Sequence, residues 1–202
     1  MTVDRSLIEN LIEALAKVIA ESEDELAELD RAIGDGDHGA NMKRGFEAVL
    51  GQLDSIAAKE LPEALQAVGM QLVMKVGGAS GPLYGTLFMS LGKAISNAPD
   101  SGELAQGFAS AIDAVKARGK SDIGCKTMLD VLGPVQQTLA AGADFAAIRA
   151  CASKAAAATV PMQATKGRAS YLGERSIGHM DPGSRSSQLM IETICDVLEA
   201  RT

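Results

Sequence analysis

The sequence predicts an all-α protein, a single bundle or barrel of helices that spans residues 1–202. Apolar residues make up 47% of the chain and aromatic residues only 3%, so Ala, Leu, Ile, Val and Met must form the core. Such a composition favours helices over sheets. Apolar residues also recur at helical spacing, in segments bounded by Gly, Pro, Asn or Asp. A length of 202 residues suits one domain.

Eight segments carry this helical pattern, and none reads with confidence as a strand. In the first 29 residues the apolar positions fall on one helical face: Leu7, Ile8, Leu11, Ile12, Leu15, Val18 and Ile19. Seven further helices are expected at 41–53, 61–76, 82–95, 101–117, 126–139, 144–159 and 184–198. Pro62 falls in the first turn of its helix, where a missing N–H is tolerated.

Charge and cysteine content argue against several classes of function. The formal net charge of −7 leaves no domain-wide basic surface, so we expect neither nucleic-acid binding nor adhesion to an anionic membrane. The N-terminal residues lead into a charged amphipathic helix without a signal-peptide core, and no stretch reaches about 18 apolar residues. Cys125, Cys151 and Cys195 are scattered and form no metal or redox motif. The sequence therefore predicts a cytoplasmic protein with ordinary, reduced cysteines.

The connections between the helices are unusually rich in glycine and polar residues. They are expected at 30–40, 77–82, 118–125 and 161–183, and the last spans 23 residues. Long structureless connections inside compact domains are usually functional. Loops between helices gather at the two ends of a bundle, so we expect some of these four to meet at one end.

The first connection places Asp30, Asp35 and Asp37 within eight residues. Intervening glycines let the backbone turn sharply enough for the three carboxylates to converge. Converging carboxylates repel one another unless cations lie between them, and hard oxygen ligands select Mg²⁺ or Ca²⁺. The alternative is a solvated acidic turn that caps the next helix.

Two familiar motifs fail in this connection. A calcium-binding EF-hand loop that starts at Asp35 would need Gly and Glu where the chain has Ala40 and Phe46. The spacing of Gly34, Gly36 and Gly39 matches a dinucleotide fingerprint, but a charged helical stretch precedes it in place of a strand. Aspartates there would repel phosphates, unless Mg²⁺ bridges the carboxylates to the phosphate oxygens.

Two further connections have the character of anion sites. In 77–82, small residues precede a helix start, where free N–H groups and the helix dipole attract anions. The alternative is simple N-capping with a glycine hinge. No Walker A motif is present, and Pro82 breaks a Gly-x-Ser-x-Gly elbow. The last connection gathers Lys166, Arg168, Arg175 and His179, which suggests an anion-facing lid that becomes ordered on ligand binding. The alternative is a mobile surface loop.

Together these segments resemble the nucleotide-binding L subunit of dihydroxyacetone kinases. The resemblance rests on LDRAIGDGDHG at 29–39, GGASGPLYGT at 77–86, KTMLD at 126–130 and KGRASYLGERS at 166–176, followed by Gly178-His179 and 181–183. Four motifs in this order, over essentially the whole chain, are specific, although none would suffice alone. The family usually has Asp where this chain has Cys125, a difference that bears on local contacts near Lys126.

The resemblance implies an eight-helix antiparallel barrel with the nucleotide at one end. Asp30, Asp35 and Asp37 match the family's ligands for two Mg²⁺ ions, which hold the phosphates of ADP or ATP. Further positions match the surroundings of the nucleotide: His38, Gly39, Ala40, Asn41, Ala79, Ser80, Gly119, Met128, Arg168, Asp181, Pro182 and Gly183.

The resemblance also implies partners. A separate kinase subunit or domain would hold the ketose covalently through a histidine, so this chain would be one component of a kinase. In the phosphotransferase-dependent form ADP stays bound as a cofactor and is rephosphorylated by a phosphohistidine protein; in the other form ATP exchanges as a substrate. Alternatives are a related ketose such as erythrulose, a nucleotide-loaded regulator that binds a transcription factor, and a helical lipid carrier without nucleotide affinity. Intact carboxylates favour the kinase.

Overall fold

The structure, a computed structural model, describes residues 3–201 and contains helices and no strand within that range. Ten α-helices and one 3₁₀ helix are present in the described chain. They are α1 (Arg5–Glu21), α2 (Glu23–Ile33), α3 (His38–Leu50), α4 (Leu53–Ala57), α5 (Leu61–Lys75), α6 (Ser80–Ala94), α7 (Ser101–Gly119), α8 (Leu129–Ala140), α9 (Phe145–Ala158), η1 (Arg168–Ser176) and α10 (Pro182–Glu199). The predicted all-α class is confirmed.

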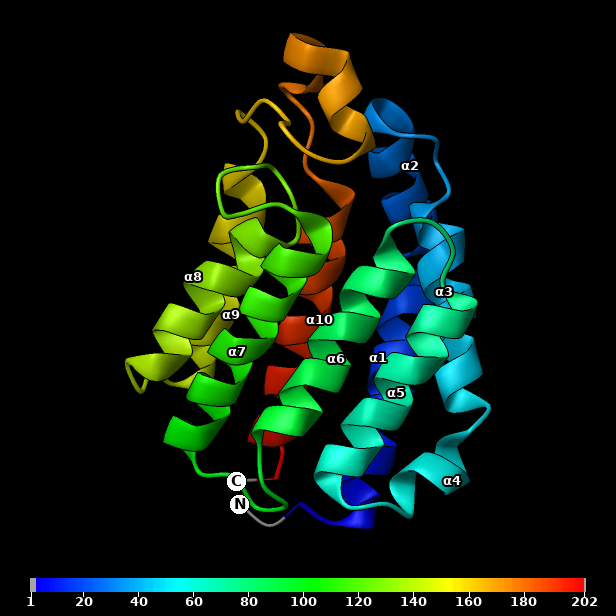
Figure 1. Ribbon diagram of the computed structural model, residues 1–202, viewed down its shortest axis with the longest axis vertical. Helices are drawn as coiled ribbons and strands as arrows, with labels where there is room; N and C mark the ends of the chain where they lie inside the picture. Colours follow the sequence, from blue (N-terminus) through cyan, green and yellow to red (C-terminus); the bar gives the residue numbers. More distant parts are fainter. Residues whose placement is uncertain (1–2, 202) are drawn as a thin grey trace.

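Eight of these helices form a closed ring. Each packs against the next in the order α1, α3, α5, α6, α7, α8, α9, α10, and α10 packs back against α1. The predicted barrel of eight helices is therefore present. The short helices α2, α4 and η1 are additions at its ends (Figure 1).

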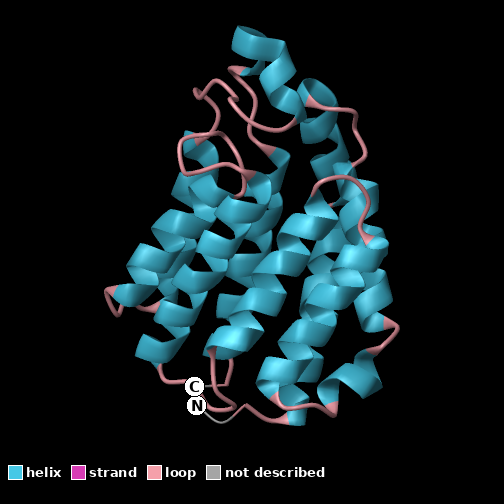
Figure 2. Cartoon of the chain, in the orientation of Figure 1, coloured by secondary structure: helices cyan, strands magenta, loops and turns pink. Residues whose placement is uncertain are grey.

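Successive helices of the ring run in opposite directions, which determines what each end of the barrel presents. Helices α3, α6, α8 and α10 all begin at the end that carries α2 and η1, while the other four end there (Figure 1). The loops, pink in Figure 2, gather at the two ends of the ring. The four glycine-rich connections predicted from the sequence lie at this same end. The opposite end holds both described chain ends, where Arg201 forms an ion pair of 2.8 Å with Asp4.

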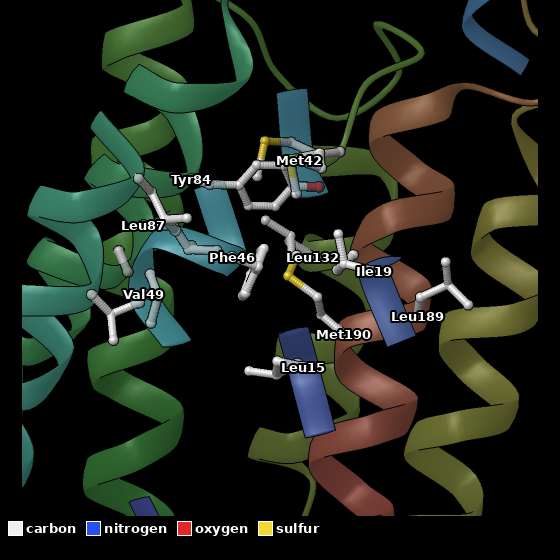
Figure 3. Close-up of a cluster of buried hydrophobic side chains, with 14 of the residues drawn as sticks. Leu15, Ile19, Met42, Phe46, Val49, Tyr84, Leu87, Leu132, Leu189 and Met190 are labelled. Carbon is white, nitrogen blue, oxygen red and sulfur yellow. The ribbon is translucent and has the colours of Figure 1, made fainter. Parts of the chain in front are cut away.

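The core fills the interior of the ring with aliphatic side chains and very few aromatic ones. Figure 3 shows Ile19, Met42, Phe46, Tyr84 and Leu132 converging from four different ring helices. Each is almost wholly buried. Full burial of a side chain of this size stabilises the fold by roughly 1.5–3 kcal/mol. The continuous core makes the ring a rigid frame for the loops at its ends.

Helices α5 and α6 approach each other very closely because two glycines face one another. A Cβ added at Gly69 would lie 2.7 Å from the carbonyl oxygen of Gly85, and a Cβ added at Gly85 would lie 2.7 Å from that of Gly69. Any side chain at either position would push the helices apart. The close contact fixes the position of the turn that joins α5 to α6.

Several helix boundaries differ from the sequence prediction. The first predicted helix is interrupted at Ser22, where φ is −98° and ψ 9°, so α2 is a separate element. Helices α3 and α6 begin earlier than expected, at His38 and Ser80, whereas α8 begins later, at Leu129. The long connection is not structureless, because it contains η1. No helix in residues 3–201 combines the length and apolar character that a membrane crossing requires.

Candidate functional site

A cavity of about 170 Å³ opens at the end of the barrel where the predicted loops meet. Its lining comes from five stretches: 30–38, 77–83, 126–128, 166–169 and 181–183. These stretches belong to the ends of α2, α3, α6, α8 and α10 and to the start of η1. The ring therefore brings together segments that are more than 140 residues apart in the chain.

One wall of the cavity is acidic. Asp30 lies in the last turn of α2, and Asp35 and Asp37 follow in the turn before α3, with Gly36 between them at φ +77°. One carboxylate oxygen from each of the three aspartates lies within 4.8 Å of the others. Asp30 Oδ2 also accepts hydrogen bonds from the backbone N–H of Asp37 (2.9 Å) and His38 (3.1 Å). The turn is thus folded onto Asp30.

The three carboxylates of this wall lie close enough together for their charges to affect the pKa of Asp30. Burial raises the pKa of Asp30, the two backbone donors oppose that effect, and the charges of Asp35 and Asp37 raise it further. Arg168, at the start of η1, forms an ion pair with Asp35. A cation between the carboxylates would remove their mutual repulsion.

The three aspartates fit a hard divalent cation. They offer only oxygen ligands, and these already converge without any rearrangement of the backbone. Mg²⁺ binds through one or two carboxylates and completes its shell with water and phosphate oxygens. Asp30, Asp35 and Asp37 are therefore suited to hold Mg²⁺ at the cavity wall, where it would supply neutralising charge to a polyphosphate.

The remaining walls present the N-termini of four helices. His38, Ser80 and Pro182 are the first residues of α3, α6 and α10, Met128 is the N-cap of α8, and all four line the cavity. The first N–H groups of a helix lack partners within the helix and carry its positive dipole end. The alternating direction of the ring helices thus brings four helix N-termini to the cavity, and that of α3 belongs to the acidic wall itself.

Helix α6 offers one of these ends without a capping side chain. Asp30 and Asp181, in contrast, accept N–H groups at the starts of α3 and α10. The preceding turn has Gly78 at φ +64°, a conformation that glycine adopts without strain. The N–H groups at the start of α6 are therefore available to an anion.

His38 is buried and connects three helices, α3, α6 and α10. Its Nδ1 lies 3.1 Å from Ser80 Oγ, and its Nε2 lies 2.9 Å from Ser186 Oγ in α10. Burial lowers the pKa of the ring to about 4, so the imidazole is neutral near pH 7. Ser186 in turn lies 2.8 Å from the hydroxyl of Tyr84, which is also buried. Because both nitrogens of the imidazole have hydrogen-bond partners, His38 links α3 to α6 and α10.

Asp181 caps α10 from inside the protein. Its Oδ2 accepts the N–H of Ser184 at 2.6 Å, and its own N–H donates to Thr159 Oγ1 at 3.1 Å. Burial raises the pKa of this carboxyl to about 7, an effect that the Ser184 hydrogen bonds reduce. Asp181 therefore adds a group that titrates near neutrality to the cavity lining.

Most of the residues predicted from the sequence lie in this cavity. The lining contains eleven of them: Asp30, Asp35, Asp37, His38, Ala79, Ser80, Met128, Arg168, Asp181, Pro182 and Gly183. Gly39, Ala40, Asn41 and Gly119 lie outside the lining. Gly39 packs against the backbone of α2, and Gly119 lies behind Leu83. The ligand contacts of all these residues stay predictions.

Sequence reasoning did not assign several residues of the lining. As individual site residues these are Ile33, Gly77, Gly78, Leu83, Lys126, Thr127, Lys166, Gly167 and Ala169. All of them fall inside motifs that carried the family resemblance, which was a usable signal. Ile33 and Leu83 are apolar residues at helix ends, and their hydrophobicity alone does not distinguish them from core residues.

The fold and the cavity define a class: all-helical barrel proteins whose open end offers carboxylates for a cation and helix N-termini for an anion. Residues 32–196 match the DAK2 domain. The chain belongs to the DAK2-domain family.

Curated relatives share nearly the whole chain. The ADP-binding subunit DhaL of the PEP-dependent dihydroxyacetone kinase of Escherichia coli (strain K12) is 43% identical over 205 residues, covering 96% of this chain and 97% of its own. The ADP-binding subunit DhaL of the PTS-dependent dihydroxyacetone kinase of Lactococcus lactis subsp. lactis (strain IL1403) is 42% identical over 194 residues, covering 95% and 98%.

A solved structure shares the fold. The dihydroxyacetone kinase of C. freundii in its native form superposes with a TM-score of 0.78 at 22% identity, over 95% of this chain and 34% of that chain. The same kinase in complex with AMP-PNP and Mg²⁺ gives a TM-score of 0.75 at 24% identity, over 97% of this chain and 34% of that chain. The ring of helices described here thus corresponds to about a third of that larger kinase.

Proposed function

We propose that this protein is the ADP-binding, magnesium-dependent subunit of a dihydroxyacetone kinase of the phosphotransferase-dependent kind. The observation that carries the proposal is the cavity itself, which three converging carboxylates line together with the N-termini of four helices. An anion alone would be repelled by that wall, and a cation alone would not need the helix ends. A metal-bound polyphosphate satisfies both.

Each part of the lining has a role in this proposal. Asp30, Asp35 and Asp37 hold two Mg²⁺ ions, whose charge offsets that of the ADP phosphates. The N–H groups at the start of α6 and the Ser80 hydroxyl bind phosphate oxygens, and Arg168 covers the site from the long connection. Positioning and electrostatic stabilisation account for most catalysis in phosphoryl transfer. The chain therefore acts by holding the nucleotide in a fixed, charge-balanced position.

The proposed function requires partner proteins. A separate subunit holds the ketose, and a phosphohistidine protein rephosphorylates ADP, which stays bound here as a cofactor. The full-length matches to relatives named as ADP-binding subunits support this division of labour. A nucleotide-loaded form of the protein that also binds a transcription regulator is compatible with the same site.

An ATP-dependent kinase for a related ketose is the second candidate. The D-erythrulose kinase of Mycolicibacterium smegmatis (strain ATCC 700084 / mc(2)155) is 34% identical over 97% of this chain, but this chain covers only 36% of that protein. The relatives of matching length are instead subunits of PEP- or PTS-dependent enzymes. Their identity of 40–43% with this chain, higher than that of the erythrulose kinase, favours the phosphotransferase-dependent form.

Calorimetry on one variant tests the metal–nucleotide assignment. Asp35→Asn keeps the size of the side chain but removes its charge, and we expect the affinities for Mg²⁺ and for Mg-ADP to fall together by at least about tenfold. Asp54→Asn is the matched control, because Asp54 is exposed in α4 at the opposite end of the barrel. Unchanged Mg-ADP affinity in Asp35→Asn would refute the assignment.

The choice of phosphoryl donor needs a separate experiment. We expect the purified protein to carry ADP, and incubation with a phosphohistidine protein of the phosphotransferase system to convert that ADP to ATP while it remains bound. Rapid exchange of ADP for ATP from solution, without any phosphorylation in place, would favour the ATP-dependent alternative.

A further inference from the structure

Lys126 is the least exposed charged residue among the residues described. Only 1% of its surface is accessible, although it lies in a connection at the open end of the barrel. Its backbone has φ +62°, in the left-handed region that residues with a side chain seldom adopt. Such a conformation persists only when the surrounding structure enforces it.

The ammonium group of Lys126 contacts the long connection. Its Nζ donates to the carbonyl oxygen of Met162 at 3.0 Å and to that of Ser176 at 2.5 Å. Met162 precedes η1 and Ser176 is its last residue, so one cation joins the two sides of the loop. Burial lowers the pKa of the Lys126 ammonium, and the nearby charge of Asp181 opposes that effect.

Asp130 holds Lys126 in this position. Its Oδ1 accepts the N–H of Gly124 at 2.6 Å, and its Oδ2 accepts the N–H of Thr127 at 2.7 Å. The carboxylate thus bonds to the backbone on both sides of Lys126. These bonds explain how the chain maintains the left-handed turn that directs the ammonium toward Met162 and Ser176.

The two segments of the long connection, one before η1 and one from its last residue onward, also form hydrogen bonds with each other near Lys126. Ser176 Oγ accepts the N–H of Ala164 at 2.9 Å, and Gly178 donates its N–H to the carbonyl of Val160 at 2.8 Å. Residues 162–178, called the lid below, therefore form a loop that is closed at its base. Arg168 projects from this lid to Asp35 on the acidic wall.

We propose that Lys126 is a positioning residue: it fixes the base of the lid and thereby holds Arg168 over the nucleotide site. The inference rests on the proposed function, because it assigns the purpose of the lid to nucleotide retention. Lys126 lines the cavity, but its ammonium is bonded to the lid base, so it acts on the nucleotide through Arg168 and not by direct contact.

A double-mutant cycle tests this role. Lys126→Met removes the ammonium but keeps an unbranched chain of similar length. We expect Mg-ADP to dissociate from the protein about tenfold faster in Lys126→Met and in Arg168→Ala. The double variant should show the same increase of about tenfold as each single variant, because both changes remove the same interaction. A purely structural role would give effects that multiply.

Hydrogen exchange supplies an independent readout that needs no nucleotide. We expect amide exchange in 163–177 to accelerate by at least about tenfold in Lys126→Met, while the ring helices keep their protection. Lys116→Met is the matched control, since Lys116 pairs with Asp122 on the same α7–α8 connection at 2.8 Å without touching the lid. In Lys116→Met, neither the rate of Mg-ADP dissociation nor the rate of amide exchange in the lid should change.

The possible outcomes separate the two proposals. If wild-type protein binds no Mg-ADP, the proposed function fails. If it binds, and Lys126→Met leaves dissociation and lid exchange unchanged or multiplies the effect of Arg168→Ala, the role of Lys126 is refuted while the proposed function stands. Should Lys126→Met not fold, Lys126→Gln retains an N–H donor and is expected to give smaller changes in the same direction; normal lid exchange in that variant counts against the inference.

Discussion

Arg168 and Asp35 form an ion pair across the open end of the barrel, joining the long connection to the acidic wall. The same carboxylate belongs to the trio of aspartates whose oxygens converge. The guanidinium and a metal ion are therefore competitors for Asp35, whereas the guanidinium and a phosphate are natural partners. One residue is thus expected to influence cation binding and nucleotide binding in opposite directions.

Arg168→Ala should tighten the binding of a divalent cation alone, by about two- to tenfold, because a competing positive charge is removed. The same variant should weaken binding of Mg-ADP. Mn²⁺ binding followed by electron paramagnetic resonance, and calorimetry with Mg-ADP, measure the two effects. Arg175→Ala, at the far end of η1, should change neither quantity. A parallel decrease in both affinities would contradict the competition.

His38 should make the protein less stable in mild acid. Its pKa is lowered from 6.5 to about 4, so the neutral ring stabilises the fold fully above pH 6.5, and this contribution is lost as the pH falls toward 4. The slope from this group approaches about 1.4 kcal/mol per pH unit. Urea unfolding at pH 5 and pH 7 should show a smaller pH dependence for His38→Gln than for wild type. His179→Gln, at an exposed position, should keep the wild-type dependence.

Asp181 should have the opposite pH dependence. Its pKa is raised from 3.8 to about 7, so the folded state loses stability as the pH rises from 3.8 through 7 and the buried carboxyl ionises. Asp181→Asn keeps an oxygen for the Ser184 N–H and should gain stability at pH 8 relative to pH 5, on the order of 2 kcal/mol. Thermal unfolding without nucleotide measures this gain.

Asp144→Asn is the control for that experiment. Asp144 is also an N-cap, accepting the N–H of Ala147 at 2.8 Å, but it is exposed at the start of α9. Its substitution should give the same small change at both pH values. If Asp181→Asn behaves like Asp144→Asn, burial of the Asp181 carboxyl does not govern its titration.

Gly39 should matter for packing and not for contact with a ligand. A Cβ at this position would collide with the carbonyl oxygen of Glu23 in α2, so Gly39→Ala should lower the free energy of unfolding by about 1–3 kcal/mol. Gly51→Ala meets only ordinary contacts at the end of α3 and should be nearly neutral. Chemical denaturation of both variants compares them. Equal stabilities would indicate that α2 moves to accommodate the methyl group.

The ring of helices was predictable because its signal is local. Apolar periodicity and glycine or proline boundaries identified all eight ring helices. Ser22 ends α1 without a glycine or proline, so the break between α1 and α2 had no clear signal. Helix η1 lies in a polar segment interrupted by Gly173 at φ +58°, so no apolar periodicity marked it in the sequence.

The acidic wall was predictable for a similar reason. Asp30, Asp35 and Asp37 are close in the sequence, and glycines between them allow convergence. The convergence of four helix N-termini depends on the alternating direction of the ring, which follows from topology and not from any one motif. The burial of Lys126 was not predictable, since a left-handed lysine leaves no mark in the sequence. A cytoplasmic location and the two-ion count stay predictions.

The pairing of Asp4 with Arg201 has a practical consequence. Because the two described ends of the chain adjoin each other at the barrel floor, a short peptide could join them, and new ends could be opened at the exposed turn between α8 and α9. A circularly permuted chain of this kind would keep every helix of the ring. A tag or surface attachment joined to either described end would likewise lie away from the mouth of the cavity.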